Sequence, residues 1–202
     1  MSAAGRERLV VNLGCGPRGS SLPPFFRGWR ELRVDVDEAV EPDVLADLTD
    51  LSPIPAGAAD AIWAAHCVEH LYAHEVPTAL VQFRRLLRPE GFACVIVPDL
   101  QTVAQQVAAN RMHETLYQSA SGPITPHDIF FGFGPAIAAG NTAMAHRCGF
   151  TPGVLEQCFG DQLFAEVVLR RRVREFELAA VAWASPVGDE AARSALLNAL
   201  VP

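Results

Sequence analysis

The stretch that most constrains the fold is a short apolar run near the N-terminus that ends in three glycines. It reads Val-Val-Asn-Leu-Gly-Cys-Gly-Pro-Arg-Gly over residues 10–19. A brief apolar run bounded by turn residues is typical of a buried strand. Glycines permit a turn with positive φ and no Cβ in the way. A strand followed by a glycine loop opens many nucleotide-binding α/β domains, so the sequence predicts a ligand held close to the main chain here.

The glycine spacing also matches the dinucleotide fingerprint, G-x-G-x-x-G, through Gly14, Gly16 and Gly19. Two features argue against a dinucleotide. Pro17 lacks the backbone N–H that a pyrophosphate would use. Residues 20–24, Ser-Ser-Leu-Pro-Pro, are a poor start for a long helix whose dipole could face a phosphate. A ligand without phosphates at this loop fits better, and a plain strand-ending turn is the alternative.

The segment Asn-Leu-Gly-Cys-Gly-Pro over residues 12–17 resembles the first motif of class I S-adenosylmethionine-dependent methyltransferases. Further matching motifs follow in the family's order: Leu-Arg-Val-Asp-Val-Asp (32–37), Val-Leu-Ala-Asp-Leu (44–48), Ala-Ile-Trp-Ala-Ala-His (61–66) and Leu-Arg-Pro-Glu-Gly-Phe (87–92). The resemblance covers residues 9–99, about half of the chain. It implies an α/β fold, a Rossmann-like three-layer sandwich with a mostly parallel seven-stranded sheet and a C-terminal antiparallel hairpin.

The same resemblance implies S-adenosyl-L-methionine as the cofactor. Asp35 would accept hydrogen bonds from the two ribose hydroxyls, which suits an acceptor-only carboxylate. Asp37 takes that role if the register differs by two residues. Asp47 stands where the family contacts the adenine amino group. The predicted cofactor-binding residues are Asn12, Gly14, Cys15, Gly16, Asp35, Asp37, Asp47, Leu48, Ala65 and His66.

Methyl transfer from a sulfonium needs mainly alignment and desolvation from the protein. A general base is required only where the acceptor is a hydroxyl or a protonated amine. His66 and His127 are the candidates, because imidazole titrates near neutral pH. We therefore expect methyl transfer to a small-molecule or sugar-type acceptor. A non-catalytic cofactor-binding scaffold is the alternative, since no clear base stands out.

A third alternative is a zinc-dependent hydrolase, because His-Cys-Val-Glu-His over residues 66–70 matches H-x-x-E-H. That zinc site needs both histidines on one helix. His66 is expected at a strand end instead, where its ring would not share a face with that of His70. We therefore expect no metal, and we expect Glu69 and His70 to cap a short helix.

One domain is expected over residues 1–202, with a cofactor-binding half at 8–99, a substrate-pocket or lid segment at about 110–150, and a C-terminal helix and hairpin at 151–184. Strands are expected near 8–14, 31–36, 43–46, 59–65 and 91–97. Helices are expected at 75–87, 100–109 and 151–159, and hairpin strands at 163–171 and 176–183. Residues 38–43 are too few for a crossover helix between parallel strands.

The composition indicates which binding partners and which cellular compartment are expected. A net charge of −7 does not favour binding to DNA or RNA, because both are polyanions. The chain has no apolar run long enough to span a membrane, and its first eight residues lack the apolar core of a signal peptide. Five scattered cysteines fit neither a disulfide framework nor a zinc cage. We expect a cytoplasmic protein that binds a small-molecule substrate, with a homodimer left open.

Overall fold

The central element is a mixed sheet of seven strands in the order β3-β2-β1-β4-β5-β9-β8, seen in a computed structural model that describes residues 6–20, 22–119, 121–160 and 163–201. The strands are β1 (Leu9–Leu13), β2 (Arg30–Asp35), β3 (Val44–Leu45), β4 (Ala59–Ala65), β5 (Leu87–Pro98), β8 (Glu166–Arg172) and β9 (Glu177–Trp183). The first five are parallel, and β9 runs antiparallel to both β5 and β8. This confirms the predicted sheet and its C-terminal hairpin.

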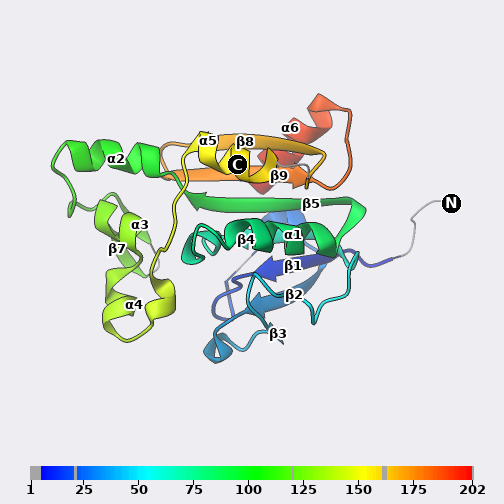
Figure 1. Cartoon of the computed structure of the whole chain (residues 1–202), viewed down its shortest axis with the longest axis horizontal. Helices are drawn as coiled ribbons and strands as arrows, with labels where there is room; N and C mark the ends of the chain where they lie inside the picture. The colour runs from blue at the N-terminus through cyan, green and yellow to red at the C-terminus, as the bar shows by residue number, and fades with distance from the viewer. Residues whose placement is uncertain (1–5, 21, 120, 161–162, 202) are drawn as a thin grey trace.

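Helices cover both faces of the sheet and make the three layers. On one face lie α1 (Val76–Leu86) and α5 (Pro152–Gly160) (Figure 1). The other face is covered by η1 (Pro24–Phe26) and α6 (Glu190–Leu200). The apolar side chains Val76, Leu80 and Phe83 form one buried stripe of α1, as the period of 3.6 residues requires. The sequence reasoning did not identify α6.

Short turns replace the helices that usually connect parallel strands on the β1–β3 side. Between β1 and β2 the only helical turn in the described residues is η1, and between β2 and β3 it is η2 (Glu38–Val40). Around η1, Phe25, Phe26 and Trp29 pack against Trp63 of β4 and Phe92 of β5. Aromatic side chains bury large apolar areas each. This aromatic cluster therefore covers the sheet where a crossover helix is missing.

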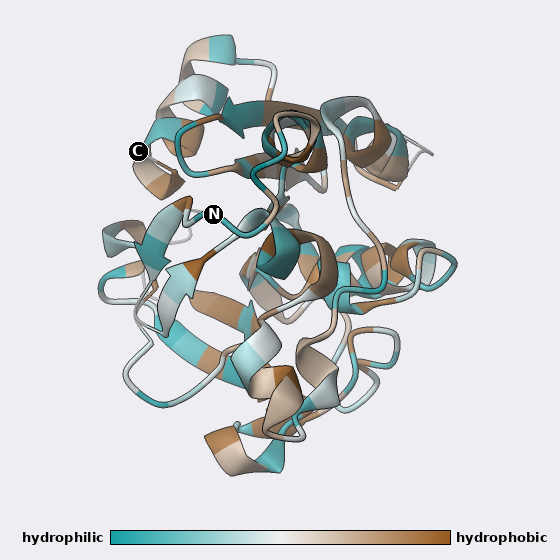
Figure 2. Ribbon diagram, turned by 90° about the vertical axis from the view of Figure 1, so that its left-hand side faces the viewer, coloured by the Kyte–Doolittle hydropathy of each residue, from teal (hydrophilic) through white to brown (hydrophobic). Residues whose placement is uncertain are grey.

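A group of short elements stands beyond the carboxyl ends of the parallel strands (Figure 1). It comprises α2 (Leu100–Ala108), β6 (Tyr117–Ser119), β7 (Gly122–Ile124), α3 (Pro126–Phe131), α4 (Gly134–Ala138) and η4 (Thr142–Met144). Of these elements only α2 was predicted from the sequence, as a helix at 100–109, because the others are brief. Local chemistry forms them nonetheless: Thr125 and Asp128 make a capping box that starts α3. Figure 2 shows the molecule from this side.

Several element ends differ from the sequence prediction. β5 begins at Leu87 rather than near residue 91, because Leu87 pairs with Ala59 before a register shift lets Phe92 pair with Ala61. β8 begins at Glu166 rather than residue 163. The first five residues, on which part of the signal-peptide expectation rests, lie outside the described residues. In the described part of the chain, every helix is too short or too polar to cross a bilayer.

Candidate functional site

The glycine loop follows β1 directly and has the backbone geometry that glycine allows. Gly14 and Gly16 have φ values of +64° and +60°. A Cβ on Gly14 would lie 2.5 Å from Cβ of Cys67, much closer than side-chain atoms pack. The backbone N–H of the buried Cys15 donates to the carbonyl of Val34 at 3.1 Å, which ties the loop to β2. The loop thus packs tightly between the end of β2, at Val34, and the residues just after β4, at Cys67.

Asp35, the last residue of β2, lies against this loop. Its Oδ2 accepts from the backbone N–H of Gly16 at 2.9 Å, and its Oδ1 accepts from that of Asp37 at 3.1 Å. Each carboxylate oxygen keeps capacity for another donor. The side chain of Asp37 is used differently, because its Oδ1 accepts from the backbone N–H of Ala39 and caps η2. Of the two alternatives, the structure brings Asp35 to the glycine loop.

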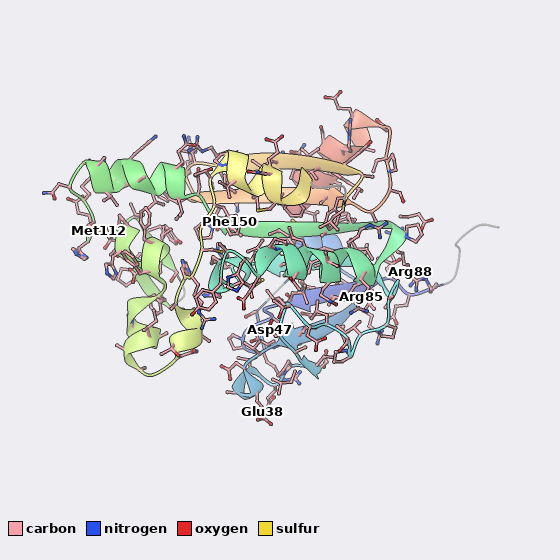
Figure 3. All side chains as sticks on the ribbon, in the orientation of Figure 1. Glu38, Asp47, Arg85, Arg88, Met112 and Phe150 are labelled. Atoms are coloured by element: carbon pink, nitrogen blue, oxygen red, sulfur yellow. The ribbon has the colours of Figure 1, made fainter. Side chains whose placement is uncertain are left out.

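The remaining predicted cofactor residues have separate environments. Asp47 is exposed after β3, where its Oδ1 accepts from the backbone N–H of Thr49 at 2.8 Å, and Leu48 beside it is buried (Figure 3). Asn12 is buried, and its Nδ2 donates to Oε1 of Glu31 at 2.7 Å. The amide of Asn12 is therefore engaged between β1 and β2.

Arg33 is a residue of this region that the sequence reasoning missed. It is buried in β2, and its Nη2 donates to the carbonyl of Gly16 at 2.6 Å and to that of Val40 at 3.3 Å. One guanidinium therefore joins the glycine loop to η2. The signal in the sequence was an arginine between the apolar residues Leu32 and Val34, because an arginine is rarely buried without partners.

His66 lies directly after β4 with a φ of +54°, in the left-handed region that non-glycine residues seldom adopt. Its Nε2 donates to Oε1 of Glu177 at 3.0 Å, and its Nδ1 is 3.5 Å from Oε1 of Glu69. Burial by itself lowers the pKa of His66, but the hydrogen bond to Glu177 and the nearby negative charge of Glu69 raise it to about 10. The imidazole therefore carries a positive charge at neutral pH in this arrangement.

Glu69 and His70, in η3 (Val68–His70), do not cap that turn, so the sequence interpretation was wrong for both. His70 Nδ1 donates to the carbonyl of Ala145 at 3.1 Å. The carboxylate of Glu69 is 1% exposed, and neither oxygen has a hydrogen-bond partner among the described residues. Burial raises the pKa of Glu69, but His66, His70 and His146 together lower it. The backbone carbonyl of Glu69 instead accepts from Arg147 and Cys148.

A cavity of about 140 Å³ lies between these residues and the short elements beyond the sheet. Its walls include His66, Glu69, Tyr117, Phe176 and Glu177, which come from three separate parts of the chain. The sequence reasoning found no pattern that pointed to Tyr117 or Glu177, because their proximity arises only on folding.

His127, the second candidate base, does not line this cavity. Its ring packs against Phe131, with centroids 5.0 Å apart, and against His113 at 5.3 Å. The structure therefore does not bring the two predicted histidines, His66 and His127, to one place.

Comparison with known proteins agrees with this geometry. Residues 11–95 match the family described as methyltransferase domain. The fold is similar to a SAM-dependent methyltransferase from Archaeoglobus fulgidus, with 15% identity, a TM-score of 0.57, and coverage of 87% of this chain and 86% of that one. No curated protein matches the sequence.

Two further solved structures share the fold. One is the 1,6-didemethyltoxoflavin-N1-methyltransferase of Burkholderia thailandensis, with bound 1,6-didemethyltoxoflavin and S-adenosylhomocysteine (15% identity, TM-score 0.52, 90% of this chain and 72% of that chain). The other is the CMeT domain of the citrinin polyketide synthase (12% identity, TM-score 0.57, 90% of this chain). The chain spans only 48% of the length of that structure.

The residues at the carboxyl end of the sheet fit the cofactor of these relatives. Two glycines with positive φ bring the main chain close to the end of β1, and the carboxylate of Asp35 lies beside them with acceptor capacity to spare. A ligand binds at this edge in open α/β sheets, where the strand order reverses between β1 and β4. Residues 11–95 therefore match a methyltransferase domain, and the chain has the fold of these S-adenosylmethionine-dependent methyltransferases.

Proposed function

We propose that the protein transfers a methyl group from S-adenosylmethionine to a small-molecule acceptor with hydroxyl groups, such as a sugar-type compound. The observation that carries this proposal is the cavity beside His66, at the point where β4 ends and the elements beyond the sheet begin. Its volume of about 140 Å³ suits part of a small molecule. Its walls are largely apolar, and the polar side chains among them, which include His66, Tyr117 and Glu177, offer hydrogen bonds to such an acceptor.

The cofactor would lie along the strand ends next to this cavity. In the proposed arrangement the loop Gly14–Cys15–Gly16 passes beneath its methionine part, and Asp35 accepts from both ribose hydroxyls. Asp47 and Leu48 border the adenine, and Ala65 and His66 border the sulfonium. Asn12 supports the loop from within the sheet, because its amide is held by Glu31. Asp37 supports it through η2, whose first turn it caps.

When bound, the cofactor supplies an electrophilic methyl carbon, and an acceptor oxygen forms the new bond as the carbon–sulfur bond breaks. The protein's part is to align the acceptor and exclude water. His66 suits this role because Glu177 fixes its ring at the cavity wall. His127 lies outside the cavity, so the proposal assigns it no contact with the acceptor.

The first test is the binding of S-adenosylmethionine, measured by calorimetry for the wild type, Asp35→Ala and the control Asp37→Ala. Loss of a charged hydrogen-bond acceptor should weaken binding by about 1–3 kcal/mol in Asp35→Ala. Asp37→Ala should change binding much less, because that side chain caps η2. Equal effects of the two variants would contradict the proposed ribose contact.

The second test is turnover, followed as S-adenosylhomocysteine release with a panel of small hydroxylated compounds. His66→Gln should lower kcat for any compound that the wild type methylates, whereas the control His127→Gln should leave kcat unchanged. Cofactor binding without turnover of any compound would instead support the scaffold alternative.

A further inference from the structure

The inner wall of the cavity holds a cluster of three side chains with metal-binding chemistry. Glu69 and His70 belong to η3, and His146 follows η4. One potential ligand atom from each of the three lies within 4.8 Å of the others. Folding therefore brings two imidazoles and one carboxylate together from distant parts of the chain.

The carboxylate of Glu69 faces the charged ring of His66 but has no hydrogen-bond partner among the described residues. It is 1% exposed, and neither oxygen has a hydrogen-bond partner among the residues that the structure describes. The nearby Nδ1 of His66 is 3.5 Å away, while the other nitrogen of that ring is already bonded to Glu177 at 3.0 Å. Buried carboxylates are usually paired or bound to a metal. The charge of His66 reaches Glu69 only across 3.5 Å and without a hydrogen bond, so both oxygens of Glu69 keep lone pairs for a metal ion shared with His70 and His146.

The two histidines are oriented as metal ligands are. Nδ1 of His70 donates to the carbonyl of Ala145 at 3.1 Å, and Nδ1 of His146 donates to the carbonyl of Ile129 at 2.7 Å. Because a carbonyl can only accept, each Nδ1 carries a proton, and Nε2 is the ring nitrogen that can bind a metal. A backbone carbonyl that fixes the tautomer in this way is a common outer contact of metal-bound histidines. The rings lie edge to face, with centroids 4.9 Å apart.

We propose that Glu69, His70 and His146 bind one divalent transition-metal ion of the zinc type, with an open coordination position toward the cavity. Two imidazoles and a carboxylate suit Zn²⁺ and neighbouring first-row metals. Mg²⁺ and Ca²⁺ prefer oxygen ligands throughout. Three protein ligands leave a fourth position for water or a substrate atom, as in catalytic zinc sites.

What the metal would do there rests on the proposed function. The open position of the metal would face the cavity assigned to the acceptor. There the metal would bind the oxygen of an acceptor hydroxyl and lower the pKa of that hydroxyl. The ligand set differs from that of the H-x-x-E-H hydrolases. Glu69 serves as a ligand, His66 is not one of the three, and His146 comes from a separate segment.

The test titrates chelator-treated protein with Zn²⁺ alone, by calorimetry, in the absence of cofactor. The wild type should bind one equivalent, and Glu69→Gln and His146→Gln should each weaken binding at least tenfold. The control His113→Gln removes an exposed histidine outside the cluster and should bind Zn²⁺ as the wild type does. Mg²⁺ should not compete. No binding by the wild type, or unchanged binding in both cluster variants, would overturn the proposal.

Two further measurements distinguish loss of the metal site from misfolding and from a failure of the proposed function. Thermal unfolding of each variant shows whether it is folded, and His146→Gln tests the site even if Glu69→Gln is unstable, because His146 is only half-buried. The same preparations are titrated with S-adenosylmethionine. Failure to bind Zn²⁺ with normal cofactor binding overturns the metal site alone. Zn²⁺ binding without cofactor binding supports the metal site and contradicts the proposed function.

Discussion

At the scale of single residues, Gly14 and Gly57 illustrate two reasons why a position requires glycine: a backbone conformation with positive φ, and a lack of space for a side chain. Both have a φ of +64°. A Cβ on Gly57 would meet nothing within 4 Å, whereas a Cβ on Gly14 would lie 2.5 Å from Cβ of Cys67. Gly57 is thus required only by its backbone conformation, while Gly14 is also required by the close approach of a neighbouring chain segment.

The pair makes a matched prediction about stability. Gly57→Ala should lower the free energy of unfolding by about 1–2 kcal/mol, the usual cost of a left-handed conformation for a residue with a Cβ. Gly14→Ala should cost more, because Cys67 must also move, and it should weaken S-adenosylmethionine binding as well. Urea unfolding of both variants measures the difference in stability. An equal loss of unfolding free energy in the two variants would mean that Cys67 moves aside without destabilising the protein.

At the scale of elements, α2 depends on one buried carboxylate at the junction of β5, β8 and α2. Asp99 is fully buried and caps α2 by accepting from the backbone N–H groups of Gln101 and Thr102. Its Oδ2 also accepts from Nε of Arg171 at 2.5 Å. Figure 3 labels Phe150 beside the end of β5, where its carbonyl accepts from the backbone N–H of Leu100. The side chain of Asp99 therefore joins the sheet to the elements beyond it.

This carboxylate predicts a dependence of stability on pH. Burial raises the pKa of Asp99, but Arg171 and Thr102 outweigh it and hold the pKa below its usual value. The contribution of Asp99 is therefore complete above the unfolded pKa of about 4 and is lost as the pH falls through the folded pKa.

The measurement is the free energy of unfolding between pH 6 and pH 2 for the wild type and Asp99→Asn, where the pH limits are roughly set by the ordinary pKa of aspartate. Asparagine keeps an oxygen for the cap but loses the charge facing Arg171. The wild type should be the more stable near neutral pH, and the difference should shrink in acid. A difference that stays constant over this range would show that the charge of Asp99 does not stabilise the fold.

At the scale of the whole molecule, the sheet and the elements beyond it differ in how they are packed. β5 and β9 are buried along most of their length. In α3 only Pro126 and Ile129 are buried, and α4 has no buried residue among those described. Met112, labelled at the outer side of this part in Figure 3, is only half-buried. The cavity therefore lies between a firmly packed sheet and a cover with few apolar contacts.

Because local stability follows buried contacts, the cover should open more easily than the sheet. Native-state hydrogen exchange should show lower opening free energies for the amides of α3 and α4 than for those of Val95 to Val97 in β5. S-adenosylhomocysteine should protect the strand ends more than α4. Equal protection of α3 and β5 in the free protein would mean that the cover and the sheet open as one unit.

Much of the fold could be predicted from the sequence, because it depends on local patterns. The apolar run before Gly14 marks β1, the stripe of Val76, Leu80 and Phe83 marks α1, and the few residues between β2 and β3 exclude a crossover helix. Burial of these patterns follows from their period alone. The early start of β5 could not be predicted, because Leu87 is paired by its neighbour Ala59 and not by its own sequence.

The sequence by itself determined the α/β sheet, the glycine loop and the placement of an acidic residue at the end of β2, since each depends on residues close together in the chain. Only the tertiary structure shows that the carboxylate of Asp35 lies on the glycine loop whereas that of Asp37 caps η2. It also separated His127 from His66, and it set His146 beside Glu69 and His70. Such groupings join side chains far apart in sequence, and no local pattern encodes the distances between them.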